Sequence, residues 1–223
     1  MSKTLTIIPA RRGSKRIPRK NLRKLNGLSL IEHSIIYAQN NIEYTQHICI
    51  STDDSEILKV AKKYNVDVVK RPKELSGDLA TTVSAIKHVL QTLDNNYENV
   101  VLLQPTNPLR PKNLLKEAYG IYSKSKSDSL ITVSKNDKKL GKITDGKYIP
   151  YSYKMGQRSQ DIDPLYFENG LLYITKASLI LEDKILSDSN IAFIVDHPYS
   201  LVDIDEEDDF KFAEFVLNNY PNE

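Results

Sequence analysis

The stretch TLTIIPARRGSKRIPRKN (residues 4–21) joins a short apolar run to a long basic segment. Residues 4–9 have the length and composition of a buried strand, and Pro9 is expected to end it. The residues that follow, from 10 to 27, are rich in glycine, proline and asparagine and predict a loop. This stretch therefore predicts a basic loop directly after the first strand of a sheet.

Strand-like and helix-like segments alternate along the rest of the chain. Residues 30–39 carry apolar side chains at the spacing of one helical face. The same patterns predict strands near residues 47–51, 66–69, 100–103, 170–174 and 191–195 and helices near 54–63, 82–93, 112–123 and 206–219. This alternation is typical of βαβ units. We therefore predict an α/β fold, a Rossmann-like three-layer sandwich with a mainly parallel sheet.

The predicted topology also places the ligand site. Right-handed crossovers between parallel strands bring the ligand crevice to the carboxyl ends of the strands. The segments 9–21, 52–54, 70–82 and 104–110 all follow predicted strands. We expect these loops to share one rim of the sheet.

One segment departs from the alternation. Residues 134–165 begin with a polar run, continue with the aromatic stretch YIPYSY (residues 148–153) and lack helical periodicity. We interpret this segment as a small arm on a single domain that covers residues 1–223. Because exposed apolar surface needs cover, the aromatic stretch predicts that the arm mediates dimerisation and that the protein is a homodimer.

Composition restricts the class of protein. A hydrophobic content of 40% and a charged content of 27% are typical of a globular protein, and a formal net charge of +2 gives no general argument for nucleic-acid binding. No apolar run approaches the roughly 20 residues of a membrane-spanning helix. The single cysteine, Cys49, lies in an apolar run and is expected to be a buried core residue. We expect a cytoplasmic protein that binds neither nucleic acid nor membrane.

Charge is concentrated in two segments. Eight cationic residues lie between Arg11 and Lys24 with no acidic residue among them, and six acidic residues lie between Asp203 and Asp209. This distribution predicts a phosphate site and a cation site.

The basic loop lacks both the GxxxxGK[ST] pattern of a P-loop and the GxGxxG dinucleotide pattern. A solvated surface is the alternative, but a place directly after the first strand favours anion binding by cationic side chains and backbone N–H groups. Asp53 is a candidate support for this loop and Asp54 a candidate helix N-cap, and neither is assigned to catalysis.

Asp203 and Asp205 form a candidate metal site. They are separated by one residue, and in extended backbone such side chains project to the same side. Mg²⁺ favours oxygen ligands of this kind. The alternative is a solvated acidic helix start, which residues 206–209 fit well. We predict that Asp203 and Asp205 bind Mg²⁺.

Five separated segments of the chain resemble the CMP-sialic acid synthetases, or N-acylneuraminate cytidylyltransferases. They are IPARRGSKRIPRKN (residues 8–21), VKRPKEL (69–75), LLQPTNPLR (102–110), ENG (168–170) and DID (203–205). Their order covers nearly the whole chain, so together they are far more specific than any one segment. The related Kdo cytidylyltransferases share a version of the first segment, which alone does not separate the two groups.

The resemblance implies roles for individual residues. On the nucleotide side it implies that Arg11, Ser14 and Lys20 contact the phosphates of CTP, that Asn21 and Arg71 lie around the nucleotide, and that Ala80 and Thr82 contact cytosine and ribose. On the sugar side it implies Gln104 and Arg158, whose guanidinium would pair with a carboxylate. Arg11, Lys20 and Asp205 are the implied catalytic set. Arg12 and Arg16 receive no assignment.

The activity implied by the resemblance is a nucleotidyl transfer. The anomeric hydroxyl of an acidic nine-carbon sugar of the sialic acid type attacks the α-phosphorus of CTP, and pyrophosphate leaves, with Mg²⁺ as the cofactor. The alternatives are CMP activation of legionaminate, pseudaminate or Kdo, and residues 104–106 and 168–170 favour a nonulosonate over Kdo. A catalytically silent nucleotide-binding protein is the alternative from another class. The resemblance also implies a homodimer.

Overall fold

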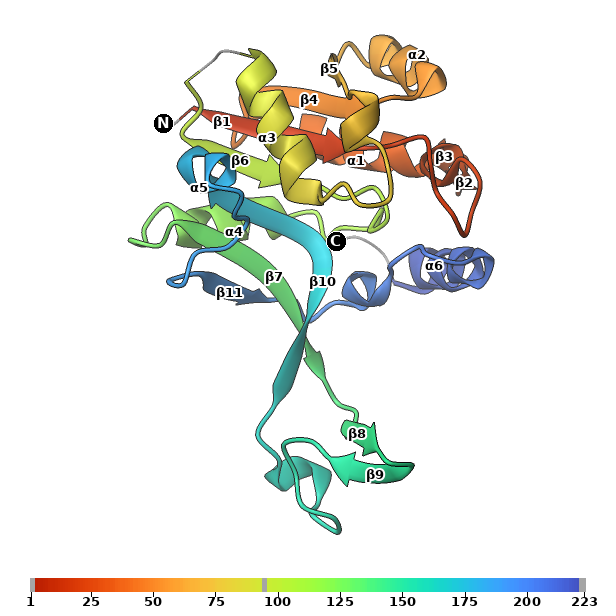
Figure 1. Cartoon of the computed structure of the whole chain (residues 1–223), viewed down its shortest axis with the longest axis vertical. Helices are drawn as coiled ribbons and strands as arrows, with labels where there is room; N and C mark the ends of the chain where they lie inside the picture. The colour runs from red at the N-terminus through yellow and green to blue at the C-terminus, as the bar shows by residue number, and fades with distance from the viewer. Residues whose placement is uncertain (1–2, 94–95, 221–223) are drawn as a thin grey trace.

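The computed structural model describes residues 3–93 and 96–220, and its centre is a twisted sheet (Figure 1). Within the described residues, seven strands form this sheet in the order β11-β7-β10-β6-β1-β4-β5. The strands are β1 (Thr4–Pro9), β4 (His47–Thr52), β5 (Asp67–Lys70), β6 (Asn99–Leu102), β7 (Ser129–Asn136), β10 (Leu165–Lys176) and β11 (Ile191–Ile194). Strand β1 pairs in parallel with β4 and β6, whereas β10 runs antiparallel to both β6 and β7. The sheet is therefore mainly parallel.

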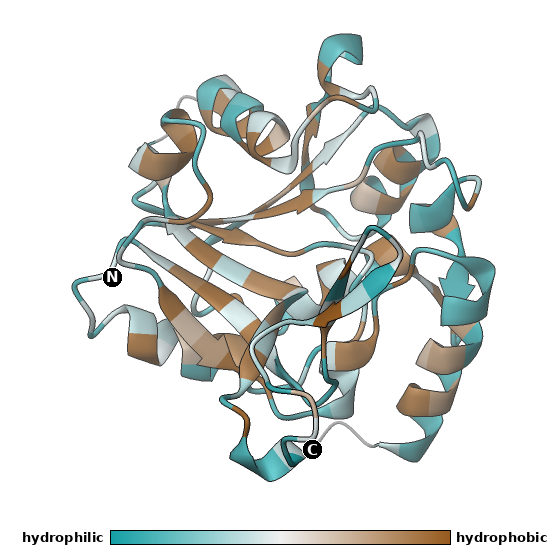
Figure 2. Cartoon of the chain, turned by 60° about the horizontal axis from the view of Figure 1, so that its bottom comes forward, coloured by the Kyte–Doolittle hydropathy of each residue, from teal (hydrophilic) through white to brown (hydrophobic). Residues whose placement is uncertain are grey.

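Helices cover both faces of the sheet. They are α1 (Leu30–Gln39), α2 (Ser55–Lys63), α3 (Thr82–Leu93), α4 (Leu114–Tyr122), α5 (Ala177–Leu181) and α6 (Glu207–Asn219). Alternate residues of β1 point to opposite faces: Leu5 and Ile7 pack in the core with α3 and α5, and Ile8 packs in the core with α1, α2 and α4. Figure 2 shows the apolar residues gathered on the strands between these layers. The predicted α/β sandwich is confirmed.

The first half of the chain follows the predicted pattern closely. Each strand and helix predicted between residues 4 and 123 is present, with its ends within two residues of the predicted ones. The second half differs. Strand β7 was not predicted, and the predicted strand at 170–174 is the middle of the 12-residue β10. Cys49 is fully buried, as predicted, and burial raises the pKa of its thiol to about 12.

An arm projects from the sheet (Figure 1). Beyond the sheet, β7 and β10 continue as a two-stranded ribbon in which Leu165 pairs with Asn136 and Phe167 with Ser134. The ribbon carries a hairpin of β8 (Gly141–Thr144) and β9 (Lys147–Pro150), followed by the 3₁₀ turn η3 (Ser159–Asp161). The arm coincides with the predicted segment 134–165, and its role in dimerisation stays a prediction.

A separate apolar cluster joins the two charged segments. Ile17 of the basic loop is fully buried against Ile204, which lies between Asp203 and Asp205, and against Phe210 of α6. The two short strands β2 (Lys24–Leu25) and β3 (Leu28–Ser29) continue this packing through Leu25, and η4 (Pro198–Leu201) continues it through Tyr199. Apolar packing therefore brings the basic and acidic segments together. In the described part of the chain, no helix has the length and apolarity needed to cross a membrane.

Candidate active site

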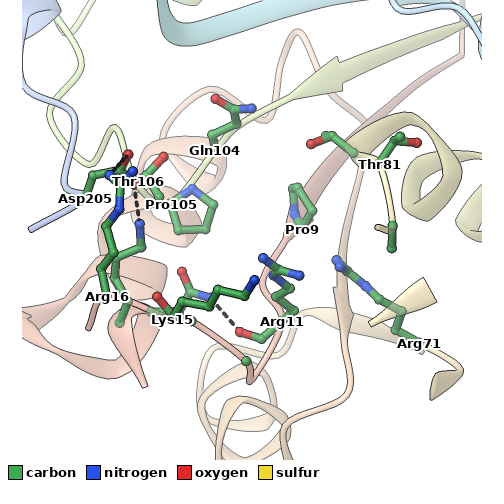
Figure 3. Close-up of a pocket in the computed structure, with 16 residues that line it drawn as sticks. Pro9, Arg11, Lys15, Arg16, Arg71, Thr81, Gln104, Pro105, Thr106 and Asp205 are labelled. Carbon is green, nitrogen blue, oxygen red and sulfur yellow. Dashed lines mark hydrogen bonds and ion pairs between the residues drawn. The ribbon is translucent and has the colours of Figure 1, made fainter. Parts of the chain in front are cut away.

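A cleft of about 420 Å³ opens where the parallel strands end (Figure 3). The loops after β1, β5 and β6 form its walls, as the topology predicted, and the segment before α6 closes one end. It is lined by Pro9, Arg11, Gly13, Ser14, Lys15, Arg16, Lys20, Asn21, Arg71, Ala80, Thr81, Thr82, Gln104, Pro105, Thr106 and Asp205. Every predicted nucleotide-binding residue is therefore in one cleft, together with Gln104 and Asp205.

The basic loop is held in place by polar contacts from neighbouring segments. The backbone N–H of Arg12 donates to Asp53 Oδ1 at 2.7 Å, and Asn21 Nδ2 donates to the carbonyl oxygen of Arg11 at 3.0 Å. Asp53 therefore supports the loop, as predicted. Asp54 caps α2 by accepting a hydrogen bond from the backbone N–H of Glu56 at 2.9 Å, also as predicted.

Two cations of the basic loop meet a carboxylate from the opposite wall. Lys15 Nζ lies 2.9 Å from Asp78 Oδ2, and Arg11 Nη1 lies 3.6 Å from Asp78 Oδ1. Arg11 Nη1 also donates to the carbonyl oxygen of Gly77 at 2.7 Å. The hydrogen bond from Lys15 lowers the pKa of Asp78, so this carboxylate is ionised at neutral pH. The loop between η2 (Lys73–Leu75) and α3 thus supplies a counter-ion to the basic loop.

Arg71 lies at one end of the cleft, on the same side as Thr81, and Asp205 lies at the other end (Figure 3). The Arg71 side chain is buried and donates to the Ser51 hydroxyl at 3.1 Å and to the Ser51 carbonyl oxygen at 2.9 Å. Burial lowers its pKa to about 10, which leaves the guanidinium charged at neutral pH. Arg71 therefore contributes a fixed positive charge to its end of the cleft.

The end of the cleft at Asp205 combines an acid with two cations. Lys20 Nζ donates to Asp205 Oδ1 at 2.9 Å and to the carbonyl oxygen of Ile204 at 2.7 Å. Arg16 Nη1 donates to Asp205 Oδ2 at 3.1 Å. The hydrogen bond from Lys20 is the main cause of the lowered pKa of Asp205. Both carboxylate oxygens of Asp205 therefore face a cation.

Asp203 does not line the cleft, but it lies two residues before Asp205, which does. Its side chain keeps an open surface, yet the surrounding protein atoms displace part of its hydration, and this raises its pKa. The charge of Asp205 raises the pKa further, while Lys20 and Thr106 oppose the shift. A cation bound between the two carboxylates would oppose this effect of the Asp205 charge on the pKa of Asp203.

These two carboxylates fit a hard divalent cation that takes its other ligands from elsewhere. Among residues 3–93 and 96–220, no group of three or more histidine, cysteine and acidic side chains is placed to hold a metal ion. Mg²⁺ does not need such a cage, because it usually binds one or two carboxylates and completes its shell with water and substrate phosphate. The donor set at Asp203 and Asp205 is of this type.

The loop after β6 is fixed by buried polar side chains that the sequence did not single out. Asn107 Nδ2 donates to the carbonyl oxygens of Asn169 at 3.0 Å and Val202 at 3.2 Å. Arg110 donates to the carbonyl oxygens of Gln104 at 2.8 Å and Leu171 at 2.7 Å. Both residues lie within the segment 102–110, one of the five segments that resemble the family. That resemblance was the only feature of the sequence that pointed to them. They hold Gln104 between the acidic segment and the bend of β10 at Gly170, where φ is +69° and the pairing of β10 with β7 shifts register.

Arg158 is a predicted site residue that lies away from the cleft. It lies on the arm, where its guanidinium binds Asp161 through Nε at 2.7 Å and Nη2 at 3.1 Å. The ribbon of β7 and β10 carries this part of the chain away from the sheet (Figure 1). Within one chain, the structure therefore gives no support to its predicted place beside the sugar.

Comparison with known proteins agrees with this geometry. The profile of the cytidylyltransferase family matches residues 5–214. An N-acylneuraminate cytidylyltransferase of Streptococcus agalactiae is 35% identical over an alignment of 215 positions that covers 93% of this chain and 52% of the relative. A pseudaminic acid cytidylyltransferase of Campylobacter jejuni is 36% identical over an alignment of 231 positions that covers 96% of this chain and 96% of the relative. The present chain thus spans about half the length of the S. agalactiae relative.

A solved structure adds an independent likeness. CMP:2-keto-3-deoxy-manno-octonic acid synthetase, in complex with CTP, has a TM-score of 0.72 at 13% identity, with 97% of this chain and 99% of that chain covered. At this identity the likeness shows a shared fold. The sequence matches confirm the resemblance that the five segments predicted, and this chain belongs to the cytidylyltransferase family.

Proposed function

We propose that this protein transfers CMP from CTP to the anomeric hydroxyl of a sialic-acid-type nonulosonate. The observation that carries the proposal is the placement of four loop cations, Arg11, Lys15, Arg16 and Lys20, around one cleft with Arg71 at one end and Asp205 at the other. A triphosphate carries its charge along a chain of phosphoryl groups, and a row of cations in a cleft matches it. The names of the relatives support cytidine as the base and an acidic sugar as the acceptor.

In this reaction the protein has to position the two substrates and to stabilise negative charge. The hydroxyl oxygen of the sugar forms a bond to the α-phosphorus, the bond from that phosphorus to the bridging oxygen breaks, and pyrophosphate leaves with the electron pair. The hydroxyl proton passes to solvent or to a nearby carboxylate. Negative charge grows on the leaving pyrophosphate, and Arg11 and Lys20, which both line the cleft, would stabilise it. Fixing both substrates in one cleft supplies much of the remaining acceleration.

In this proposal Asp203 and Asp205 would hold Mg²⁺. When bound, the ion supplies charge neutralisation on the phosphates and polarises the attacking oxygen. Asp205 would also fix the position of the Lys20 ammonium, because Lys20 Nζ donates a hydrogen bond to Asp205 Oδ1 at 2.9 Å. Asn107 connects the acidic segment to the bend of β10 through hydrogen bonds to the carbonyl oxygens of Val202 and Asn169. These bonds would keep the carboxylates in a fixed position relative to Gln104 on the sugar side of the cleft.

For the identity of the sugar, pseudaminic acid is a specific alternative. The C. jejuni relative, whose length this chain covers almost completely, is named for pseudaminic acid. Sialic acid and pseudaminic acid are both acidic nine-carbon sugars, and legionaminic acid belongs to the same group. A cleft that binds the shared carboxylate and anomeric hydroxyl accepts each of them in principle.

The test is pyrophosphate release from CTP with Mg²⁺ across a panel of sialic, pseudaminic and legionaminic acids and Kdo. We expect release with at least one nonulosonate, a CMP-sugar of matching mass, and much less release with Kdo or with ATP in place of CTP. Tight CTP binding without release for any sugar would instead identify a catalytically silent nucleotide-binding protein.

We also propose that the protein is a homodimer joined through the arm. Several apolar side chains of the arm are exposed, among them Ile143 at 78% and Met155 at 72%, and such a surface is typical of an interface. A second copy of the chain is the partner that a symmetric assembly provides. Sedimentation is the test: we expect twice the 25.4 kDa chain mass, and a species of 25.4 kDa at every concentration would contradict the proposal.

A further inference from the structure

Arg16 is one of the cleft cations to which the proposed function gives no individual role. Its Nη1 lies 3.1 Å from Asp205 Oδ2 and 3.9 Å from Glu206 Oε1. The other oxygen of the same carboxylate, Asp205 Oδ1, accepts a hydrogen bond from Lys20. Figure 3 shows Arg16 and Asp205 together at one end of the cleft.

The two cations that contact Asp205 differ in burial and in the number of their hydrogen-bond partners. The Lys20 side chain is 11% exposed, and its ammonium has a second anchor on the carbonyl oxygen of Ile204 at 2.7 Å. The Arg16 side chain is 62% exposed, and an ion pair in that much solvent is weak. A stronger ligand for Asp205 will therefore displace Arg16 before it displaces Lys20.

A divalent cation is such a ligand, and it competes with Arg16 for the same oxygen. Mg²⁺ binds carboxylate oxygens at about 2.1 Å. A guanidinium hydrogen-bonded to that oxygen opposes the approach of the ion, because the two positive charges repel each other. A metal ion that binds in the absence of nucleotide must therefore break the contact between Arg16 and Asp205, and no new partner for the guanidinium offsets that loss.

We propose that Arg16 is a displaceable counter-ion of Asp205 that makes metal binding depend on the nucleotide. Arg16 also lines the cleft, so a triphosphate that enters with the metal offers the released guanidinium phosphate oxygens. A guanidinium binds such oxygens through parallel N–H donors. The hydrogen bonds that the guanidinium forms with the phosphates then offset the loss of its ion pair with Asp205. This inference rests on the proposed function, in which Asp205 is a metal ligand.

Loss of the guanidinium should have two separate effects. Without nucleotide, metal binding becomes tighter because a competing cation is gone. With nucleotide, the additional gain in metal affinity becomes smaller, because Arg16 no longer contributes phosphate contacts. A residue that only stabilised the loop would not change these two quantities in this way.

The experiment titrates Mn²⁺, as a spectroscopic substitute for Mg²⁺, into the full chain and follows free Mn²⁺ by electron paramagnetic resonance. Arg16→Gln keeps a long polar side chain without the charge. Arg12→Gln is the matched control, since Arg12 lies on the same loop, is exposed and does not line the cleft. Its contact with Asp53 uses the backbone N–H, which the substitution retains.

We expect Arg16→Gln to bind free Mn²⁺ about two- to fivefold more tightly than the unmodified protein, the range set by weak exposed ion pairs. Arg12→Gln should match the unmodified protein. With saturating CTP, the ratio of the Mn²⁺ dissociation constants without and with nucleotide should be smaller for Arg16→Gln. Unchanged or weaker binding of free Mn²⁺ by Arg16→Gln would overturn the inference.

Asp205→Asn separates this inference from the proposed reaction. We expect that variant to lose most of its Mn²⁺ affinity. If it binds Mn²⁺ as the unmodified protein does, the metal lies elsewhere, and the inference about Arg16 is wrong together with the metal assignment. The proposed reaction is judged separately, by pyrophosphate release from the unmodified protein.

Discussion

Lys20 and Asp205 lie 185 positions apart in the chain, and their side chains meet at 2.9 Å. Beneath this contact, Ile17 and Ile204 are fully buried in one apolar cluster. The packing of these apolar residues therefore brings a basic and an acidic segment together that would otherwise be separate surface loops. In the proposed function, this contact joins a cation that binds phosphate to a carboxylate that binds Mg²⁺.

The pairing of Asp78 with Arg11 and Lys15 predicts that this carboxylate competes with the nucleotide. Asp78→Asn should raise CTP affinity about two- to fivefold, because the lost ion pairs are exposed and weak. Calorimetric titration at low ionic strength measures the effect, which added salt should reduce. Glu74→Gln, an exposed substitution in the same segment, is the control. Weaker CTP binding by Asp78→Asn would mean that Asp78 orients Arg11 for the nucleotide instead.

Gly170 is predicted to be needed for the position of Gln104. Its φ is +69°, and a Cβ there would lie 2.5 Å from Asn107 Oδ1 and 2.9 Å from Gln104 Oε1. Gly170→Ala should lower the free energy of unfolding by about 1–3 kcal/mol. It should also raise KM for the sugar more than KM for CTP. Thermal unfolding and steady-state kinetics measure the two effects.

The control for Gly170→Ala is Gly120→Ala. Gly120 lies in α4, and a Cβ there meets nothing within 4 Å. Alanine is the better helix former, so this change should stabilise the protein by up to about 1 kcal/mol without altering either KM. If Gly170→Ala behaved like Gly120→Ala, the left-handed bend would have no part in placing Gln104.

Local patterns were enough to predict the half of the fold that carries the nucleotide side of the cleft. Strand β1 is buried along nearly all of its length, and the loops that follow β1, β5 and β6 could be placed on one rim from the direction of parallel strands alone. Strand β7 was not predicted, although, like β1, it mixes buried hydroxyls with apolar residues. Thr132 donates to Asn169 Oδ1 at 2.7 Å, and this partner on β10 is known only from the folded chain.

The chemistry of the site was predictable by residue type but not by partner. The basic and acidic segments indicated phosphate and metal binding, yet neither indicated that Arg16 contacts Asp205 or that Asp78 contacts Lys15. Those pairs depend on tertiary packing between segments far apart in the sequence. The position of Arg158 on the arm could not be predicted for a related reason, since the length and direction of the arm follow from the pairing of β7 with β10.

Glu32 predicts an acid-dependent loss of stability. Burial alone would raise its pKa, but hydrogen bonds from Ser29, Lys63 and Tyr64 outweigh burial and lower it from 4.5 to about 2. Since the pKa is lower in the folded than in the unfolded chain, ionised Glu32 stabilises the fold above pH 4.5. That contribution is lost as the pH falls from 4.5 toward 2.

Glu32→Gln should therefore lower the free energy of unfolding by about 2 kcal/mol at pH 7 and by clearly less at pH 3. Urea unfolding at the two pH values measures the difference. Glu56→Gln, at an exposed residue on α2 that pairs with Lys59, should change stability little at either pH. A loss for Glu32→Gln that is equal at pH 7 and pH 3 would contradict the assignment.

The last prediction separates the metal role of the acidic segment from its structural role. Asp205→Asn keeps the size of the side chain but removes the charge that a hard cation needs. If Asp205 holds Mg²⁺ and orients Lys20, turnover at saturating CTP should fall by about 10²-fold or more, by analogy with other losses of electrostatic catalysis. The free energy of unfolding should change by about 1 kcal/mol or less, because the ion pairs of Asp205 are partly exposed.

Asp208→Asn is the matched comparison, since it removes an equal charge from the same acidic segment. Asp208 is exposed on α6, where it pairs with Lys211 at 2.7 Å and does not line the cleft. Turnover of this variant should stay close to normal across a Mg²⁺ titration, because its charge faces solvent and is screened from the cleft. An Asp205→Asn variant with near-normal turnover and an unchanged Mg²⁺ dependence would show that the pair formed by Asp203 and Asp205 is structural. In that case the metal must be held by other groups, and the contact between Lys20 and Asp205 would serve only to join the two loops.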